Sequence, residues 1–219
     1  MKFLANLLSF LLCLSPGMAS PKILVPMYDL RYANAIIAAA QKNRIAVILN
    51  IDSGPGEGRD STWVHAISRL KSAKAELFGY VDLVRFKGGK SYSRSSSEIA
   101  EDCDVWWRIY GVNAYFYDDY RATTTKTLPN ARSSIANPGY SMQTVCGTTM
   151  VWESESYLKS KPSHVQGKQA VFALGEDSYV DAYKLAKKRS VAYFYATDSG
   201  DNSKAYDDLP PYFAKLCRE

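Results

Sequence analysis

The chain has 219 residues, a formal net charge of +5, 47% hydrophobic residues, four cysteines and only two histidines. Its Lys and Arg residues are dispersed along the sequence, which argues against a nucleic-acid partner, because such a partner requires a clustered basic surface. No Cys-x-x-Cys or His-x-x-x-His spacing occurs, so the sequence predicts no metal site, and nothing in it indicates a cofactor.

Residues 1–20 have the pattern of a secretory signal peptide. Lys2 provides a short positive region, an apolar run covers residues 3–14, and a small-residue pattern ends at Ala19. The apolar run is too short to span a bilayer. We therefore expect a secreted monomer that is not attached to a membrane, with a single domain over residues 21–219. Loss of Lys2, the only charge in the signal, would lower the net charge from +5 to +4.

Removal of the signal would leave three cysteines. An exported protein can contain disulfides, so Cys103, Cys146 and Cys217 allow one bridge and one free thiol. The spacing of the three does not decide which two would pair.

Eight short β-rich runs recur along the mature chain. Most are continuous apolar runs rather than alternating ones, a pattern typical of strands that are covered on both faces. The fifth run has the weakest pattern. The sequence thus predicts strands over residues 22–28, 44–50, 75–81, 111–119, 132–138, 148–153, 169–174 and 190–197.

Helical patterns lie between several of these strands. Residues 60–70 carry apolar side chains at helical spacing, and Asp60 is placed to cap the N-terminus of that helix. Residues 97–110 show the same spacing behind a capping box formed by Ser95 and Glu98. The alternation of strands and helices therefore begins early in the mature chain.

The glycine-rich segment LNIDSGPGEGRDSTW, residues 49–63, resembles a phosphate-binding loop. It matches neither G-x-x-x-x-G-K-[ST] nor G-x-G-x-x-G, and Pro55 lacks the backbone N–H that a phosphate would need. The segment FKGGKS, residues 86–91, likewise lacks the first glycine of the phosphate-binding pattern. We therefore predict that Gly54, Pro55 and Gly56 form a tight turn and not a nucleotide site.

Eight strands that alternate with helices in one domain predict an α/β protein with a compact (β/α)8 TIM barrel. A doubly wound parallel sheet is the alternative. In a barrel, function resides on the loops that follow the C-terminal ends of the strands. Acidic, amide and aromatic residues are found at those positions in this chain, namely Tyr28, Asn50, Asp52, Tyr80, Asp82, Asp118, Asp119, Asn137, Trp152 and Glu153.

Carboxylates surrounded by aromatic residues, without a histidine or a metal cluster, suggest a glycosidase. One carboxylic acid protonates the leaving oxygen and one carboxylate attacks or activates water, while aromatic faces stack on sugar rings. Each residue also has an ordinary structural interpretation. Asp118 and Asp119 could be a helix cap and its solvated neighbour, and Glu153 could be a surface residue. Trp106 and Trp107 lie at helical spacing, so we expect both to be packing residues.

A series of motifs runs in order along nearly the whole mature chain, from Ile23 to Phe213, namely LVPMY, NIDSGPG, ISRLKSAKAELFGYV, YFYDD, NPG, VWESESY and VAYFYATD followed by DDLPPYF. In these motifs the chain resembles the spherulin-4 family. This family includes the glycoside hydrolase 135 enzymes, (β/α)8 barrels that cleave galactosaminogalactan, an α-1,4-linked galactosamine polysaccharide. The resemblance therefore implies a secreted polysaccharide hydrolase.

By resemblance, Asp118, Asp119 and Glu153 correspond to the catalytic carboxylates of the family. Two positions depart from the family pattern. The second acidic residue of the family pair is usually Glu, and this chain has Asp119 instead, which is shorter by one methylene. The first loop usually reads Asn-Pro-x-Ser-Gly-Pro-Gly, and Ile51 replaces its first proline. A displaced carboxylate can lower a rate by orders of magnitude, so Asp119 bears directly on activity.

Two hypotheses follow from the sequence. The first is an endo-acting hydrolase of an amino-sugar polysaccharide from a biofilm or cell wall, with Asp118, Asp119 and Glu153 as the catalytic set, roles within it open, and retention of configuration implied by the resemblance. Its substrate could be partly deacetylated and cationic, because the predicted cleft is acidic. Substrate contacts are expected from Tyr28, Asn50, Asp52, Tyr80, Asp82, Asn137 and Trp152. The second is a non-catalytic carbohydrate-binding or cell-surface structural protein on the same barrel.

Overall fold

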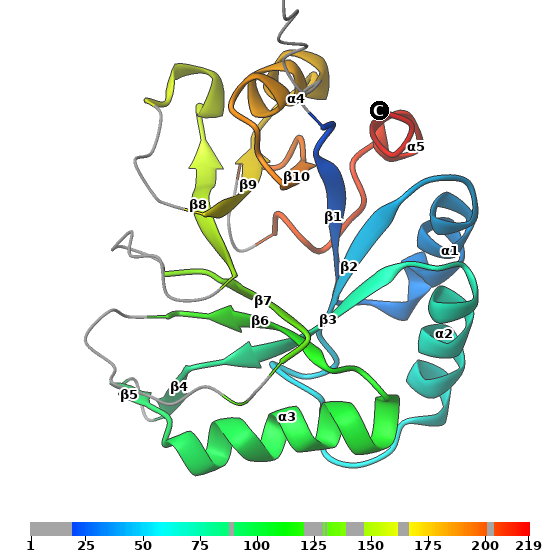
Figure 1. Cartoon of the computed structure of the whole chain (residues 1–219), viewed down its shortest axis with the longest axis vertical. Helices are drawn as coiled ribbons and strands as arrows, with labels where there is room; N and C mark the ends of the chain where they lie inside the picture. The colour runs from blue at the N-terminus through cyan, green and yellow to red at the C-terminus, as the bar shows by residue number, and fades with distance from the viewer. Residues whose placement is uncertain are drawn as a thin grey trace, which may run out of the picture.

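The computed structural model describes residues 19–87, 90–120, 129, 131–138, 147–161, 167–200 and 204–219. Within them the chain forms a closed barrel of parallel strands, and helices lie on its outer side (Figure 1). The barrel strands follow one another in chain order, and the last of them pairs with the first. This closure confirms the compact (β/α)8 barrel and excludes the doubly wound sheet.

The barrel contains eight strands, and every one of the predicted strands is among them. The strands are β1 (Lys22–Met27), β2 (Ile45–Leu49), β3 (Glu76–Asp82), β6 (Ala114–Asp118), β7 (Ser133–Ala136), β8 (Thr148–Glu155), β9 (Lys168–Leu174) and β10 (Tyr193–Ala196). The α-helices are α1 (Ala33–Lys42), α2 (Ser61–Ser72), α3 (Ser96–Tyr110), α4 (Tyr179–Lys188) and α5 (Phe213–Leu216). Two 3-10 helices cover Leu30–Tyr32 and Tyr157–Lys159.

Burial on both faces explains why the strands have continuous apolar sequences. All five residues of β2 are buried, as are the last five of β1 and of β9. One side of each strand fills the barrel and the other packs under the helices, so neither side favours polar residues. Strand β7, whose sequence pattern was the weakest, has only four residues, and β10 is the other barrel strand of this length.

Capping side chains fix where the two predicted helices begin. The Asp60 carboxylate accepts hydrogen bonds from the N–H groups of Thr62 at 2.7 Å and Trp63 at 3.1 Å. At the start of α3, Ser95 and Glu98 form the predicted capping box. Each cap satisfies N–H groups that have no partner within the helix, which confirms both predictions.

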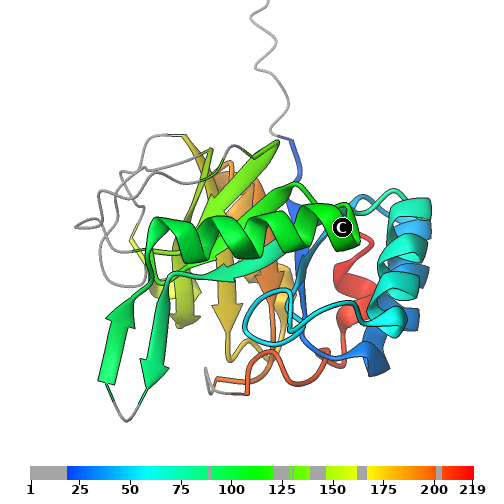
Figure 2. The same ribbon diagram turned by 90° about the horizontal axis from the view of Figure 1, so that it is seen from below.

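The structure departs from a regular barrel after β3, β6 and β7. In the described parts of the connections from β6 to β7 and from β7 to β8 there is no helix. An antiparallel hairpin that the sequence did not predict, formed by β4 (Val84–Lys87) and β5 (Lys90–Ser93), is inserted between β3 and α3. Figure 2 shows this hairpin projecting away from the body of the molecule. The FKGGKS segment, first compared with a nucleotide motif, therefore lies on a hairpin.

The two adjacent tryptophans of α3 have opposite environments. Trp106 is fully buried and its Nε1–H donates to the carbonyl oxygen of Tyr80 at 2.9 Å. Trp107 is 55% exposed, so the prediction that both residues pack in the core is wrong for Trp107. Adjacent residues on a helix lie about 100° apart, and the core-facing stripe of α3 includes only the first of them.

Trp106 sits on a glycine of the barrel wall. A Cβ atom added to Gly79 in β3 would lie 2.6 Å from ring atoms of Trp106. We expect Gly79→Ala to lower the free energy of unfolding by about 1–3 kcal/mol, because a well-packed core accommodates an added methyl group only by moving other groups. Urea denaturation measures this change.

A matched glycine provides the control for that substitution. Among the described residues, a Cβ atom at Gly147 would meet just the carbonyl oxygen of Ser134, at 3.7 Å, which is ordinary contact. Gly147→Ala should therefore leave the midpoint of denaturation nearly unchanged. Equal effects of the two substitutions would show that contact with Trp106 is not the cause.

Three other predictions concern segments away from the barrel wall. Cys103 and Cys217 are buried free thiols, so the disulfide that the sequence allowed is not formed by either of them; Cys146 lies outside the described residues. The predicted signal peptide also falls outside them, apart from its last two residues, and stays a prediction. Among the described residues, no helix is both long enough and apolar enough to cross a membrane.

Candidate active site

Two carboxylates meet at the C-terminal end of the barrel through one amide. Asp118 ends β6, Glu153 lies near the end of β8, and Asn137 directly follows the strand between them. The Asn137 Nδ2 group donates hydrogen bonds to Asp118 Oδ1 at 2.8 Å and to Glu153 Oε2 at 2.6 Å. Its backbone is held by Tyr117, whose carbonyl oxygen accepts from the Asn137 N–H at 2.8 Å. The bridging amide is therefore positioned by the sheet itself.

The shared amide sets an upper limit on the separation of the two carboxylates. Because both hydrogen bonds start from one nitrogen, the two acceptor oxygens lie at most 5.4 Å apart, the sum of 2.8 Å and 2.6 Å. Carboxyl groups lie about 5–5.5 Å apart in retaining glycosidases and about 6.5–9.5 Å apart in inverting ones. The upper limit on the separation of these two oxygens therefore lies below the inverting range and is compatible with a retaining pair.

Three tyrosines form a wall around the pair. The Tyr80 hydroxyl donates to Asp118 Oδ2 at 2.6 Å, and the Tyr206 hydroxyl donates to Glu153 Oε1. Tyr28 lies between these two rings, with centroid distances of 6.1 Å to Tyr80 and 5.7 Å to Tyr206. Each carboxylate therefore accepts one hydrogen bond from a tyrosine hydroxyl and one from the Asn137 side chain, and tyrosine rings lie around the pair.

Burial favours the protonated form of both carboxylates. It raises the pKa of Glu153 to about 7, and the nearby charge of Asp118 adds to the rise, while hydrogen bonds from Tyr206 and Asn137 oppose it. Burial also raises the pKa of Asp118, against the hydrogen bonds from Tyr80 and the Asp119 N–H. Two neighbouring carboxyl groups with raised pKa values can share one proton, and a protonated group beside a charged one is the combination that acid and base chemistry requires at neutral pH.

Asp119 and Asp82 flank Asp118 on the side away from Glu153. Asp119 has a left-handed backbone conformation, with φ of 52°, and its N–H donates to Asp118 Oδ1 at 3.0 Å. Asp82 ends the neighbouring strand β3 opposite Asp118. Burial raises the pKa of Asp82 to about 6, and the charges of Asp118 and Asp119 contribute to the rise. The candidate site therefore includes four acidic side chains.

The structure distributes the other predicted contact residues over two places. Asn50 accepts a hydrogen bond from the Gly54 N–H at 3.0 Å, which closes the predicted turn, and its side chain also bonds to Tyr28. Asp52 is exposed in the same turn. Asn50 therefore reaches the carboxylate pair through Tyr28, whereas Asp52 lines a neighbouring cavity together with Asp82.

Trp152 lies elsewhere. Its Nε1–H donates to the Ser154 carbonyl oxygen at 3.0 Å, and its ring lies 6.2 Å from that of Tyr157. Tyr157 in turn contacts Phe194 and Arg189 under α4, on the outer side of the barrel. Successive strand residues point to opposite faces, so Glu153 points inward where Trp152 points outward. The structure does not bring Trp152 to the carboxylates.

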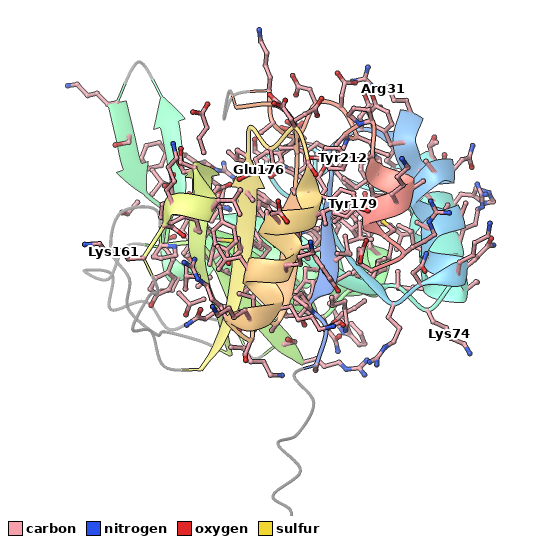
Figure 3. The ribbon with its side chains drawn as sticks, turned by 90° about the horizontal axis from the view of Figure 1, so that it is seen from above. Arg31, Lys74, Lys161, Glu176, Tyr179 and Tyr212 are labelled. Carbon is pink, nitrogen blue, oxygen red and sulfur yellow. The ribbon has the colours of Figure 1, made fainter. Side chains whose placement is uncertain are left out.

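Tyr206 is the site residue that sequence reasoning missed. It belongs to the segment after β10, which crosses the mouth of the barrel. Arg31 Nη2 donates to the Asp207 carbonyl oxygen at 3.0 Å, and the Tyr212 hydroxyl donates to the Glu176 carbonyl oxygen at 2.8 Å. Figure 3 shows Tyr212 beside Tyr179, near Glu176. These contacts hold the segment in place, and the only sequence signal for it is its position next to the DDLPPYF motif.

The hydrogen bond from Tyr206 makes a testable contribution to the pKa of Glu153. Because the phenol stabilises the charged carboxylate, Tyr206→Phe should raise the pKa of Glu153 further above its ordinary value. If Glu153 is the catalytic acid, the alkaline limb of the pH–rate profile then moves to higher pH. Tyr212→Phe removes a phenol of the same segment that donates to the Glu176 carbonyl oxygen and not to Glu153, so it should leave that limb in place. A limb that is unmoved in Tyr206→Phe would contradict this role.

The fold and the site together define an α/β protein, a (β/α)8 barrel with paired carboxylates at its C-terminal mouth. The family model of spherulation-specific family 4 (Spherulin4) matches residues 22–219, nearly the whole chain, so the protein belongs to this family. The match confirms the resemblance seen in the motifs. No curated protein and no solved structure matches the chain. Among the described residues, no group of three or more His, Cys, Asp and Glu side chains is arranged to hold a metal ion.

Proposed function

We propose that this protein is a secreted glycoside hydrolase that cuts within a polysaccharide containing α-1,4-linked galactosamine or N-acetylgalactosamine. The observation that carries the proposal is the Asn137 amide, which holds one oxygen of Asp118 and one of Glu153 within 5.4 Å of each other, the sum of 2.8 Å and 2.6 Å, closer than the carboxyl groups of an inverting pair. Secretion rests on the signal-like residues 1–20, and the glycan rests on the family resemblance. We propose a monomer that uses two carboxylates and water and needs no cofactor.

The environments of the two carboxylates suggest their roles. A pKa of about 7 leaves Glu153 partly protonated at neutral pH, so it serves as the acid that protonates the glycosidic oxygen. Burial raises the pKa of Asp118, but it accepts three hydrogen bonds, from Tyr80, Asn137 and the Asp119 N–H, that favour its charged form, one more than the two that Glu153 accepts from Asn137 and Tyr206. Asp118 is therefore the better nucleophile.

The reaction then proceeds in two displacements. The Asp118 carboxylate attacks the anomeric carbon and forms an ester to the sugar, while the bond to the leaving oxygen breaks and that oxygen takes the proton of Glu153. Water next attacks the same carbon, the ester bond breaks, and the Glu153 carboxylate takes a proton from the water. Both residues return to their starting state. Two inversions at one carbon give net retention of configuration.

The surroundings of the pair suit a polysaccharide that carries amino groups. Tyrosine faces are suited to stacking against sugar rings, and the acidic mouth would attract a partly deacetylated, cationic chain. The segment that carries Tyr206 covers one side of the mouth, where it limits the access of water to Glu153.

A non-catalytic glycan-binding protein is the second candidate. Asp119, where the family usually has Glu, favours it, because the shorter side chain reaches less far into the mouth. The test is to incubate the mature protein with α-1,4-linked galactosaminogalactan and to count new reducing ends, while binding is measured on the same preparation. Release of reducing ends supports the hydrolase. Binding without release would establish the second candidate instead.

A further inference from the structure

A cavity opens beside Asp82, the strand neighbour of Asp118. Its volume is about 410 Å³, and it lies between the turn after β2, the end of β3, the β4–β5 hairpin and α3. Asp82, Arg85 and Asp102 contribute to its walls. Ligand clefts in proteins typically enclose about 300–1,000 Å³, so this cleft is large enough for part of a glycan chain.

The cleft adjoins the candidate active site at Asp82. Asp82 lines the cleft and is also the register partner of Asp118 across β3 and β6. Neighbouring strands lie about 4.8 Å apart, so the cleft begins one strand away from the proposed nucleophile. A chain that is bound across Asp118 can therefore reach this cleft by passing Asp82.

The hairpin places an exposed aromatic residue on the cleft side. Arg85 in β4 lies directly opposite Tyr92 in β5, so the two side chains share one face of the hairpin. Arg85 lines the cleft, and Tyr92 is 42% exposed, one of the most exposed large hydrophobic residues of the described chain. Figure 2 shows that the hairpin extends past the C-terminal ends of the barrel strands. Tyr92 thus stands beyond the cleft on the path of a bound chain.

A buried arginine anchors the hairpin. Arg94 directly follows β5 and is 2% exposed. Its guanidinium donates to the Asp82 carbonyl oxygen at 2.9 Å, to Asp102 at 2.5 Å and to the Glu98 carbonyl oxygen at 2.9 Å. The same side chain therefore joins two walls of the cleft to the base of the hairpin. This fixes the hairpin relative to the cleft.

A simpler explanation is that Tyr92 and Arg85 only stabilise the hairpin as a cross-strand pair, which would be worth about 0.2–1 kcal/mol. The pair's position argues for more than that. Within the described part of the chain Arg85 makes no ion pair shorter than 4.0 Å, although it lies in a cleft with carboxylates. The guanidinium N–H groups of Arg85 and the ring face of Tyr92 are therefore both available to a ligand on the same face of the hairpin.

We propose that the β4–β5 hairpin is a substrate arm. A pyranose ring of the polysaccharide, outside the pair of rings that is cut, stacks on Tyr92, and Arg85 donates hydrogen bonds to oxygens of the chain inside the cleft. The arm makes the protein selective for chains that extend from Asp118 through the cleft to the hairpin. This inference rests on the proposed glycan substrate but not on catalysis, because binding alone can test it.

The experiment measures binding of α-1,4-linked N-acetylgalactosamine oligosaccharides of increasing length to the Glu153→Gln protein, which cannot consume them if the hydrolase proposal holds. In this background, Tyr92→Thr keeps a strand-forming residue but removes the ring. We expect it to lower the ratio of long-chain to short-chain affinity about tenfold, the size of one stacking contact. Tyr92→Phe should restore the ratio.

Trp107→Ala is the control, since it removes a more exposed aromatic residue from α3, outside the cleft walls. It should leave the ratio unchanged. A loss of affinity in Tyr92→Thr that is equal for short and long chains would indicate a structural effect and would overturn the arm. An unchanged affinity ratio in Tyr92→Thr would also overturn it. The same holds for a wild type that binds no chain of any length. If the wild type binds long chains better but releases no reducing ends, the arm stands and the hydrolase fails.

Discussion

Glu153→Gln is expected to lower the rate of glycan cleavage about 10³-fold, within the range that general acid catalysis contributes. Glutamine keeps the shape of the side chain and can still bond to Asn137 and Tyr206, but it has no proton to give to the leaving oxygen. Asp118→Asn should cause a loss of at least this size, because an amide is a much weaker nucleophile. The initial rate of reducing-end release measures both.

Substrates with different leaving groups separate the two roles. A sugar linked to a good aryl leaving group needs little protonation, so Glu153→Gln should recover much of its rate of bond cleavage on such a substrate. Asp118→Asn should not recover, because the attack itself is lost. Recovery in Asp118→Asn alone would mean that the roles are reversed.

Glu155→Gln is the matched control for these variants. Glu155 is the same residue type, two positions further along β8, and it is exposed. Its replacement should leave the rate essentially unchanged. A Glu153→Gln protein that retained a large part of wild-type activity on the polysaccharide would remove Glu153 from the mechanism.

Local sequence patterns were enough to predict the barrel. Most barrel strands are short runs that are largely buried on both faces, and both predicted helices begin at side chains that bond to free N–H groups. These features depend only on residues that are close in sequence. The hairpin was missed because its strands are short, β5 is fully exposed, and a run such as KSYS has no apolar pattern to detect.

The candidate site was predicted only in part, for a physical reason. Asp118, Asn137 and Glu153 end or follow strands, so a parallel barrel necessarily brings them to one mouth. Tyr206 arrives from a segment without regular structure, and only tertiary contacts place it there. Trp152 lies one residue before Glu153, so it points to the opposite face, and the two could not both have been directed into the barrel.

The left-handed conformation of Asp119 was also invisible in the sequence. Its φ of 52° turns its N–H toward the Asp118 carboxylate. Asp and Asn adopt this conformation more readily than longer side chains do. The departure from the family's usual Glu therefore fits the backbone at this position, and the N–H of residue 119 supports Asp118 whichever side chain it carries.

The Glu153→Gln protein should also be more stable than the wild type at alkaline pH, by at most about 3 kcal/mol. The pKa of Glu153 is raised from the ordinary 4.5 to about 7 in the folded protein. Below pH 4.5 the residue is protonated in both the folded and unfolded states and contributes no difference. Between pH 4.5 and about pH 7 only the unfolded chain releases the proton, so the free energy of unfolding of the wild type falls as pH rises through this range. It levels off above about pH 7, where the folded protein has released the proton too.

Denaturant melts at pH 4 and pH 8 measure this difference. The stabilisation by Glu153→Gln should be present at pH 8 and nearly absent at pH 4, while the exposed Glu155→Gln should change stability little at either pH. A Glu153→Gln protein that is less stable than the wild type at pH 8 would show that the fold favours the charged carboxylate. If one substitution removes activity and increases stability, then the burial of Glu153 serves the chemistry of the site at a cost to the fold, as expected of an enzyme.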